Sequence, residues 1–437
     1  MAAFPRRNVA VAYTFFMSEK RHPHPRPVTD PGTLGAELRE AAAVFLPGFE
    51  VHAAVLDAPH LLRVKTPDGD RLIRCWESTA TQAGIEFTAT ALDRAKAAGV
   101  DLVPVLMTAP GQETRHSILL HSRLFTAATW LGGRPFARYG GYRTPSGETI
   151  DIPMPQATPV EAISLEAARA LGRFHVAAKE IAAKPGTPSY TVSDFLAATR
   201  RKWANDRRIL GDRAAESTEI RRWLRCGNRV MAVGGERLEA ATSVLNDKST
   251  VIHGDLWPTH LLVSSDVAAP ELVGIAGWSH VSTGSPLIDI ANLAVHIRGW
   301  SAENAENLVA AYHSVAPLTP EQRRTLPVIA ALDLVGRVAN LLHLAFLDET
   351  MIGHESTPVL RGAVRTMLPS LETLTHVLSP PEPKKYQPAR SGSGSRGESA
   401  DGNPAATGSA KTPTRSRQTE SATRSRPEKR RGKPKRR

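Results

Sequence analysis

The sequence predicts an α+β protein with two lobes, an antiparallel sheet followed by a mostly helical part, and a disordered basic tail. Three observations support this prediction. Short extended runs separated by turns occupy the first third of the chain, segments with helical periodicity fill most of the rest, and the composition changes near Pro380 to Ser, Gly, Pro, Arg and Lys. The length of 437 residues and the hydrophobic content of 41% suit two lobes with a sizeable core.

Four parts are expected along the chain. Residues 1–33 form an N-terminal extension that we expect to be disordered, 34–131 the N-lobe, 132–379 the C-lobe and 380–437 the tail. Residues 381–437 hold 16 Lys and Arg against 5 Asp and Glu, so +11 of the formal charge of +12 belongs to the tail. The folded part is therefore expected to be nearly neutral.

Cysteine usage and hydropathy predict a cytoplasmic protein. The two cysteines, Cys75 and Cys226, do not form a metal-type pair, and two alone make no disulfide framework. The apolar run 9–16 is followed by Ser18-Glu19-Lys20-Arg21 instead of the small residues of a cleavage site, so we expect no signal peptide. We also expect no membrane span, since no other apolar run approaches about 20 residues.

The N-lobe is expected to begin with a helix over 34–45, which ends before Pro47-Gly48. An Asp68-Gly69 turn separates two extended runs and is a hairpin signal. A second helix is expected over 81–98. The expected strands are 49–56, 60–66, 71–76, 103–108 and 117–126.

The C-lobe is expected to begin with a Gly- and Pro-rich irregular loop over 135–160, which we place near the cleft. Helical periodicity dominates the residues that follow. The expected helices are 165–182, 192–210, 216–245, 289–297, 302–313, 320–348 and 358–378.

Two apolar runs of strand length, 251–263 and 272–278, predict a small hairpin with a loop at either end. The first loop carries Asp255 beside His253, and Gly254 between them allows a turn that a residue with a Cβ would resist. Loops held by a rigid scaffold are where reactive groups usually lie. This loop is therefore the candidate active centre.

The motif His253-Gly254-Asp255, Pro258 three residues on, and the later run 284–291 (Gly-Ser-Pro-Leu-Ile-Asp-Ile-Ala) resemble the aminoglycoside phosphotransferase and homoserine/choline-kinase-like family. The resemblance implies a protein-kinase-like bilobal fold. It also implies transfer of the γ-phosphate of ATP or GTP to a hydroxyl group of a small molecule, with the nucleotide bound by the N-lobe and the substrate by the C-lobe.

The resemblance assigns roles to four residues of the C-lobe. Asp255 corresponds to the catalytic carboxylate, which orients the acceptor hydroxyl as a general base. His253 and Asp289 correspond to residues that support the catalytic loop, and His175 is expected to pack against that loop.

Four N-lobe and linker residues correspond to the nucleotide site. Arg74 would face the phosphates and pair with Glu86, although the alternative of an ordinary surface ion pair stays open. Arginine differs from the family's lysine, because guanidinium is planar and ammonium is a compact charge. The backbone around Thr129 and Leu131 would meet adenine.

Three positions depart from the family pattern. His260 stands at the metal-binding asparagine, Gly277 at the metal-binding aspartate, and Ser285 replaces the aspartate of Gly-Asp-Pro. Magnesium prefers hard oxygen ligands, whereas Gly277 has no side chain and His260 offers nitrogen. His260 is thus the only metal candidate by position, and the residues argue against Mg²⁺.

Three functions remain open. The first is a small-molecule kinase with an adapted metal site, in which Arg74 supplies some of the missing positive charge. The second is a catalytically degenerate pseudokinase that acts as a ligand- or partner-binding module. The third is a nucleic-acid-associated protein that acts through the tail, whose basic end over 426–437 would bind nucleic acid or anionic surfaces by charge neutralisation.

Overall fold

The computed structural model describes residues 31–379, except for 49–50, 55–59, 137–141, 144–148, 151–156, 180, 182–187, 246–249, 267, 298 and 347–356. All of these described residues belong to one compact unit that ends at Pro381. The expectations for residues 1–30 and for the basic tail lie outside the described residues.

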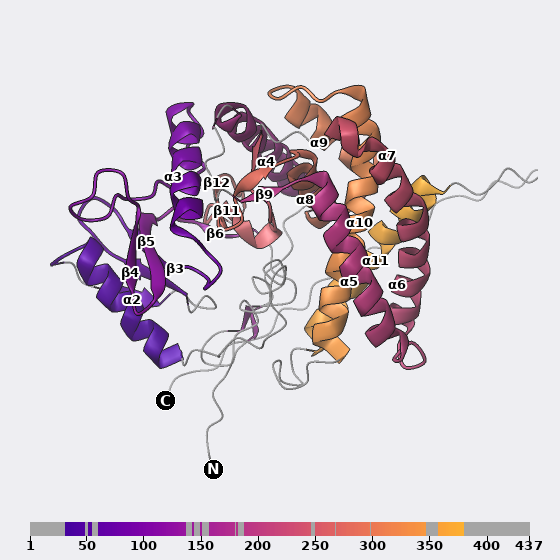
Figure 1. Cartoon of the computed structure of the whole chain (residues 1–437), viewed down its shortest axis with the longest axis horizontal. Helices are drawn as coiled ribbons and strands as arrows, with labels where there is room; N and C mark the ends of the chain where they lie inside the picture. The colour runs from indigo at the N-terminus through magenta and orange to yellow at the C-terminus, as the bar shows by residue number, and fades with distance from the viewer. Residues whose placement is uncertain are drawn as a thin grey trace, which may run out of the picture. The chain divides into compact units, whose positions relative to one another are not determined.

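The N-lobe contains a five-stranded antiparallel sheet in the order β1-β2-β3-β5-β4 (Figure 1). Helix α2 packs on this sheet through Leu38, Ala42 and Phe45, which share a buried core with Ile73 and Phe125. Helix α3 contacts both β4 and the first helix of the C-lobe. The elements are α2 (Pro31–Phe45), β1 (Val51–Ala54), β2 (Leu61–Val64), β3 (Arg71–Cys75), α3 (Gln82–Ala97), β4 (Ser117–Leu120) and β5 (Arg123–Thr129).

Two expectations for this sheet are wrong. The segment 117–126 is not one strand, because a tight turn at His121 (φ 47°) and Ser122 (φ 60°) separates β4 from β5. Two consecutive left-handed residues suit a two-residue hairpin, but glycine and asparagine usually mark such turns. The segment 103–108 forms a single bridge, Leu106 to Ala128, instead of a strand. Pro104 has no N–H to donate to a ladder.

The expected irregular loop over 135–160 contains regular structure at both ends and in its middle. Strand β6 (Arg134–Pro135) pairs with β11 (Leu261–Val263), and the two-residue strands β7 (Tyr142–Arg143) and β8 (Thr149–Ile150) pair with each other. Helix α4 begins at Ala157, eight residues before the expected start of the helix.

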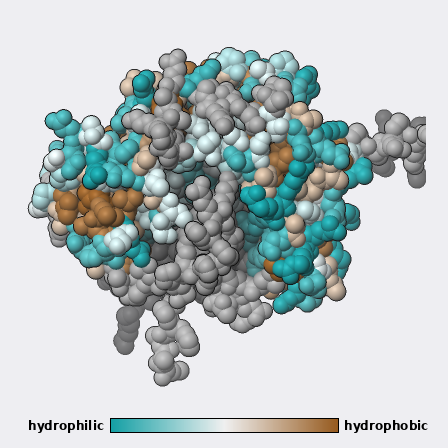
Figure 2. All heavy atoms as spheres, viewed as in Figure 1, coloured by the Kyte–Doolittle hydropathy of each residue, from teal (hydrophilic) through white to brown (hydrophobic). Residues whose placement is uncertain are grey.

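The C-lobe is mostly helical, and α10 is its central helix, in contact with α5, α6, α7, α8 and α11. The expected helix 216–245 is divided by a π-helical turn, Val230–Gly234, into α6 and α7. The basic residues of α5 are largely exposed, and in Figure 2 the visible face over α5 and α6 is mostly hydrophilic. The helices are α4 (Ala157–Ala178), α5 (Val192–Gly211), α6 (Thr218–Arg229), α7 (Gly235–Leu245), α8 (Leu287–His296), α9 (Ala302–His313), α10 (Pro320–Phe346) and α11 (Thr357–Leu378).

Within the described part of the chain, one helix is long and apolar enough to cross a membrane by length and composition. This stretch is Pro320–His343 of α10, and 83% of its most apolar window is buried inside the fold. Its apolar character follows from its central position in the helical core. The two cysteines are both buried and free.

Short strands position the candidate active centre. The expected hairpin exists as β11 (Leu261–Val263) and β12 (Leu272–Ile275). Strand β10 (Val251–Ile252) pairs instead with β13 (Ser282–Gly284), which pairs in parallel with β9 (Ser189–Tyr190). The loop 253–260 therefore connects two different sheets.

Candidate active site

The backbone of the 253–260 loop is held by a carboxylate of α8. Asp289 accepts hydrogen bonds from the backbone N–H of His253 (2.7 Å) and of Gly254 (2.9 Å) through its two oxygens. Gly254 has φ 82°, and a Cβ at this position would lie 2.5 Å from the carbonyl oxygen of His280. Only glycine fits this turn without strain.

Two further side chains position Asp289, which we call the clamp of the 253–260 loop. The Nε2 atom of His175 on α4 lies 3.0 Å from Asp289 Oδ2, and its Nδ1 atom lies 2.8 Å from the hydroxyl of Tyr312. Burial is the largest influence on the pKa of Asp289 and would raise it, but the contacts with His175, His253 and the N–H of Gly254 together hold this pKa below its usual value. Asp289 is therefore an ionised acceptor for the loop.

The carboxylate of Asp255 is buried, with 3% of the residue exposed. Its Oδ1 atom accepts a hydrogen bond from Trp257 Nε1 (2.7 Å) and lies 3.3 Å from Nη1 of Arg337 on α10. Burial is the largest influence on the pKa of Asp255 and would raise it, but the guanidinium of Arg337 and other nearby groups together outweigh burial and lower this pKa. This carboxylate is thus already ion-paired within the protein.

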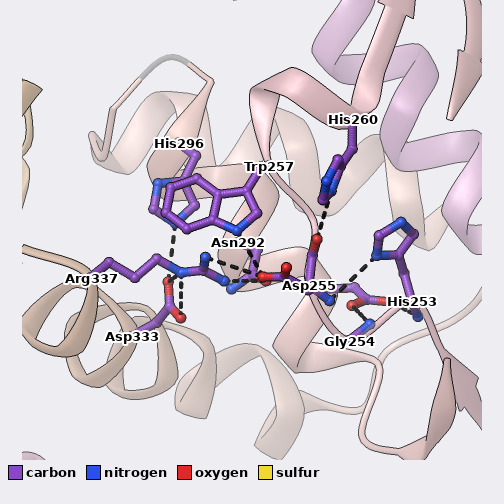
Figure 3. A network of polar contacts seen from close by, with 10 residues as sticks. His253, Gly254, Asp255, Trp257, His260, Asn292, His296, Asp333 and Arg337 are labelled. Carbon is purple, nitrogen blue, oxygen red and sulfur yellow. Dashed lines mark hydrogen bonds and ion pairs between the residues drawn. The ribbon is translucent and has the colours of Figure 1, made fainter. Parts of the chain in front are cut away.

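Several polar side chains and one aromatic ring contact the guanidinium of Arg337 (Figure 3). Its Nε atom lies 3.0 Å from both oxygens of Asp333, and Nη2 donates to Asn292 Oδ1 at 3.1 Å. Its guanidinium carbon lies 3.9 Å from the ring centroid of Trp257, within cation–π distance. Burial would lower the pKa of Arg337, but the carboxylates of Asp333 and Asp255 raise it.

Arg337, Asp333 and Asn292 are not among the residues that the sequence predicts for the site. One signal was available, since Asp333 and Arg337 stand four residues apart within an apolar helix, where charges are rare unless they are paired. His296 completes the cluster, with Nε2 at 3.1 Å from Asp333 and its ring stacked on Trp257 at 4.8 Å between centroids.

His253 and His260 both act as internal hydrogen-bonding groups. His253 Nε2 lies 2.8 Å from the carbonyl oxygen of Ala276, and His260 Nδ1 lies 2.8 Å from the carbonyl oxygen of Asp255. Burial lowers the pKa of both rings, that of His260 to about 4. Both rings are therefore neutral near pH 7.

The described residues do not fit Mg²⁺. Gly277 contributes no side chain, and the ring of His260 fills the space where a Cβ of residue 277 would lie, at 2.6 Å. Among the residues described, no group of three or more His, Cys, Asp and Glu side chains is placed to hold a metal ion. The oxygen ligands that Mg²⁺ requires are not assembled around Asp255.

Arg74 and Glu86 are not brought together. The guanidinium of Arg74 lies 4.9 Å from the ring centroid of Trp76, and its Nε atom is buried without a hydrogen-bond partner in the described part of the chain. Glu86 accepts hydrogen bonds from the backbone N–H of His116 (2.8 Å) and contacts its Nδ1 atom (2.5 Å). His116 thus takes the place expected for Arg74.

Thr129 and Leu131 lie where the sheet lobe meets the next strands. The N–H of Thr129 donates to the carbonyl oxygen of Val105 (2.9 Å), and its Oγ1 accepts from the N–H of Val105 (3.0 Å). The side chain of Leu131 packs on Gly274 of β12, where an added Cβ would lie 3.0 Å away. The N–H of Thr129 is therefore committed within the N-lobe.

Comparisons with known proteins agree with this architecture. The model of the phosphotransferase enzyme family matches residues 59–326, more than half of the chain. A microcompartment-associated aminopropanol kinase has a similar structure, with 16% identity over 79% of this chain and 98% of its own, at a TM-score of 0.55. An aminoglycoside phosphotransferase from Alicyclobacillus acidocaldarius is 12% identical over 83% of this chain and 98% of its own, at a TM-score of 0.52.

No curated protein sequence matches this chain. The two structural neighbours support the expected bilobal, protein-kinase-like fold, with its antiparallel sheet and helical C-lobe. The extent of the family match confirms the resemblance drawn from the 253–255 and 284–291 motifs, and the chain belongs to the phosphotransferase enzyme family.

Proposed function

We propose that this chain is a ligand-binding member of its family that does not transfer phosphate by the magnesium-dependent route. The observation that supports this proposal is the buried ion pair between Asp255 and Arg337. A general base must lie within hydrogen-bond reach of the acceptor hydroxyl and be able to accept its proton. A carboxylate that is 3% exposed and paired with a guanidinium is poorly placed for this task.

The loss of metal ligands supports the same proposal. Removing one preorganised group that stabilises developing charge costs a factor of about 10²–10³ in rate. Here the two positions that the resemblance assigns to the metal are a glycine, Gly277, and a neutral histidine, His260, whose Nδ1 is bonded to the protein backbone. The charge on transferring phosphates would lack its usual counter-ion.

The ligands that we propose are a nucleotide, ATP or GTP, and a hydroxyl-bearing small molecule. The family supports both classes, and one structural neighbour is an aminopropanol kinase. The Nε atom of Arg74, which has no hydrogen-bond partner among the described residues, lies on the strand where the family meets the phosphates and supports a nucleotide in the N-lobe. We propose a cytoplasmic location for this binding function.

A second candidate is an active small-molecule kinase that phosphorylates an alcohol group with Asp255 as its base. The observation in its favour is the clamp of Asp289, which still fixes the backbone of His253 and Gly254 with two hydrogen bonds. A nucleic-acid role stays a prediction, because it depends on the tail beyond the described residues.

The experiment compares the full-length chain with an Asp255→Asn variant. Thermal unfolding is followed with ATP and GTP, each with and without Mg²⁺ and Mn²⁺, and the same mixtures are assayed for loss of the γ-phosphate, with and without amino alcohols as acceptors. A ligand at about 100 times its Kd stabilises the folded state by about 2.7 kcal/mol.

A rise in Tm with nucleotide, without turnover in either variant, would support the binding proposal. Turnover in the wild type that Asp255→Asn abolishes would overturn it in favour of the second candidate. If neither nucleotide stabilises the chain and no turnover is seen, the proposal that the chain binds a nucleotide is overturned.

A further inference from the structure

The side chain of His260 lies on the bare face of Gly277. A Cβ added to Gly277 would lie 2.6 Å from Cγ, Cδ2 and Cε1 of the imidazole. Real Cβ atoms essentially never come within 3.0 Å of a neighbouring heavy atom. Even alanine would therefore force the ring of His260 to move.

The ring of His260 is fixed from several directions. Its Nδ1 atom lies 2.8 Å from the carbonyl oxygen of Asp255, and its centroid lies 5.6 Å from that of His253. Its backbone N–H donates to Trp257, and its carbonyl oxygen accepts the N–H of Ala276, the residue before Gly277. The two chain segments are thus joined at this point, which leaves the ring little freedom to swing away.

The same contact excludes a cation from this position. Carbon atoms of the imidazole occupy the space through which a side chain of residue 277 would project, and Asp255 Oδ1 is already taken by Trp257 and Arg337. Divalent cations such as Mg²⁺ need several oxygen ligands, and the side chains of residues 260 and 277 supply none.

We infer that His260 and Gly277 are a coupled pair that closes the divalent-cation position of the family, so that this chain binds no Mg²⁺ or Mn²⁺ between these two residues. The coupling is steric. Residue 277 can gain a side chain only when residue 260 loses its ring, so the two positions must change together. The inference deepens the proposed function, but it concerns metal binding by the chain without any nucleotide and can therefore be tested apart from it.

The test is a set of full-length variants, His260→Asn, Gly277→Asp and the double variant, compared with the wild type. Tm is measured with and without Mg²⁺, and binding of Mn²⁺ is measured by electron paramagnetic resonance in the absence of nucleotide. Gly277→Asp alone should lower Tm by about 2–6 °C, since a side chain at residue 277 would overpack against the ring of His260 and the φ of 83° adds strain. The double variant should regain the part of this loss that comes from overpacking against the ring.

The double variant should also bind Mn²⁺, whereas the wild type should not. A matched control combines Gly277→Asp with His280→Asn, which removes a neighbouring histidine but leaves His260 over residue 277. This control should remain as unstable as Gly277→Asp. If Gly277→Asp does not fold, the comparison of the double variant with this control still tests the coupling.

Two results would overturn the inference. One is specific binding of Mn²⁺ by the wild type that His260→Asn alters, and the other is a double variant no more stable than the His280 control. Turnover by the wild type that Asp255→Asn abolishes, without metal binding at this position, would overturn the proposed function in favour of the second candidate and leave this inference intact.

Discussion

Arg337 pairs with Asp255 across 82 residues of sequence, with 3.3 Å between Nη1 and Oδ1. Both residues are buried, and the guanidinium also contacts Asp333 and Asn292. The pair therefore joins the 253–260 loop to the central helix of the C-lobe. Stability and the geometry of the loop should depend on the same guanidinium.

Replacing Arg337 by leucine should lower the free energy of unfolding by about 3–5 kcal/mol, because two buried carboxylates lose their shared cation. Guanidinium chloride denaturation followed by circular dichroism measures this change. Arg324→Leu is the control, since Arg324 forms an ion pair with Glu321 while its side chain is 71% exposed, and its loss should cost at most about 1 kcal/mol. Similar losses in the two variants would show that the Arg337 pair adds little.

Local signals predicted much of the fold. The boundaries of α9, Ala302–His313, agree with the sequence expectation residue for residue, and the hydroxyl of Ser301 accepts the N–H of Asn304 at the start of this helix. The turn between β4 and β5 could not be found in this way, because His121 and Ser122 adopt positive φ without a glycine or asparagine to mark them. Propensity does not identify such turns.

Local motifs likewise predicted only part of the candidate site. A short motif located His253 and Asp255, and the structure places Asp289 against the same loop. The contact of Asp255 with Arg337 depends instead on how α10 packs, and no local pattern links two residues so far apart. The partners of Arg74 were also beyond prediction, because side-chain packing on Trp76 decides where its guanidinium lies.

Asp289→Asn should loosen the 253–260 loop. An amide has one acceptor oxygen, so the N–H of His253 or of Gly254 loses its partner, which costs about 1–3 kcal/mol for a buried donor. Hydrogen exchange of these two amides should become faster by about tenfold or more, since 1.4 kcal/mol corresponds to a factor of ten.

The control is Asp266→Asn, which changes an aspartate that accepts the N–H of Ala268 in an exposed turn. Exchange in the 253–260 loop should be the same in this variant as in the wild type. Unchanged protection of His253 and Gly254 in Asp289→Asn would show that the clamp does not limit the opening of the loop.

Arg74→Met should leave the free energy of unfolding unchanged within about 1 kcal/mol. Burial lowers the pKa of Arg74, so its charge is costly, and methionine keeps much of the packing on Trp76 while losing a cation–π contact worth about 0.5–1 kcal/mol. Glu86→Ala is the comparison, because the partly buried N–H of His116 loses its acceptor, which costs about 1–3 kcal/mol. Urea denaturation compares the unfolding free energies of the two variants. A larger decrease for Arg74→Met than for Glu86→Ala would contradict this account.

Unfolding should become easier as the pH falls from about 6.5 to 4, partly because of His260. Its pKa is about 4 in the folded chain, lowered by burial, against 6.5 as the ordinary value, so the unfolded chain binds about one more proton at this residue within that window. The stability that His260 contributes is complete above pH 6.5 and is lost as the pH falls through this range, at up to about 1.4 kcal/mol per pH unit. His260→Asn should therefore reduce the difference in unfolding free energy between pH 7 and pH 4.5 by about 2–3 kcal/mol.

His121 serves as a control, because its pKa shift has the opposite sign to that of His260. Its Nε2 atom lies 2.7 Å from Glu40, and this contact raises the pKa of His121, so its contribution is present at low pH and is lost as the pH rises through the folded pKa. His121→Asn should therefore not reduce the loss of stability on acidification, whereas His260→Asn should reduce it. Chemical denaturation at five pH values between 4 and 7 compares the three proteins. If the unfolding free energy of the wild type and of His260→Asn depends on pH in the same way, the ring of His260 takes up its proton in the folded state. That result would contradict a closed, neutral site.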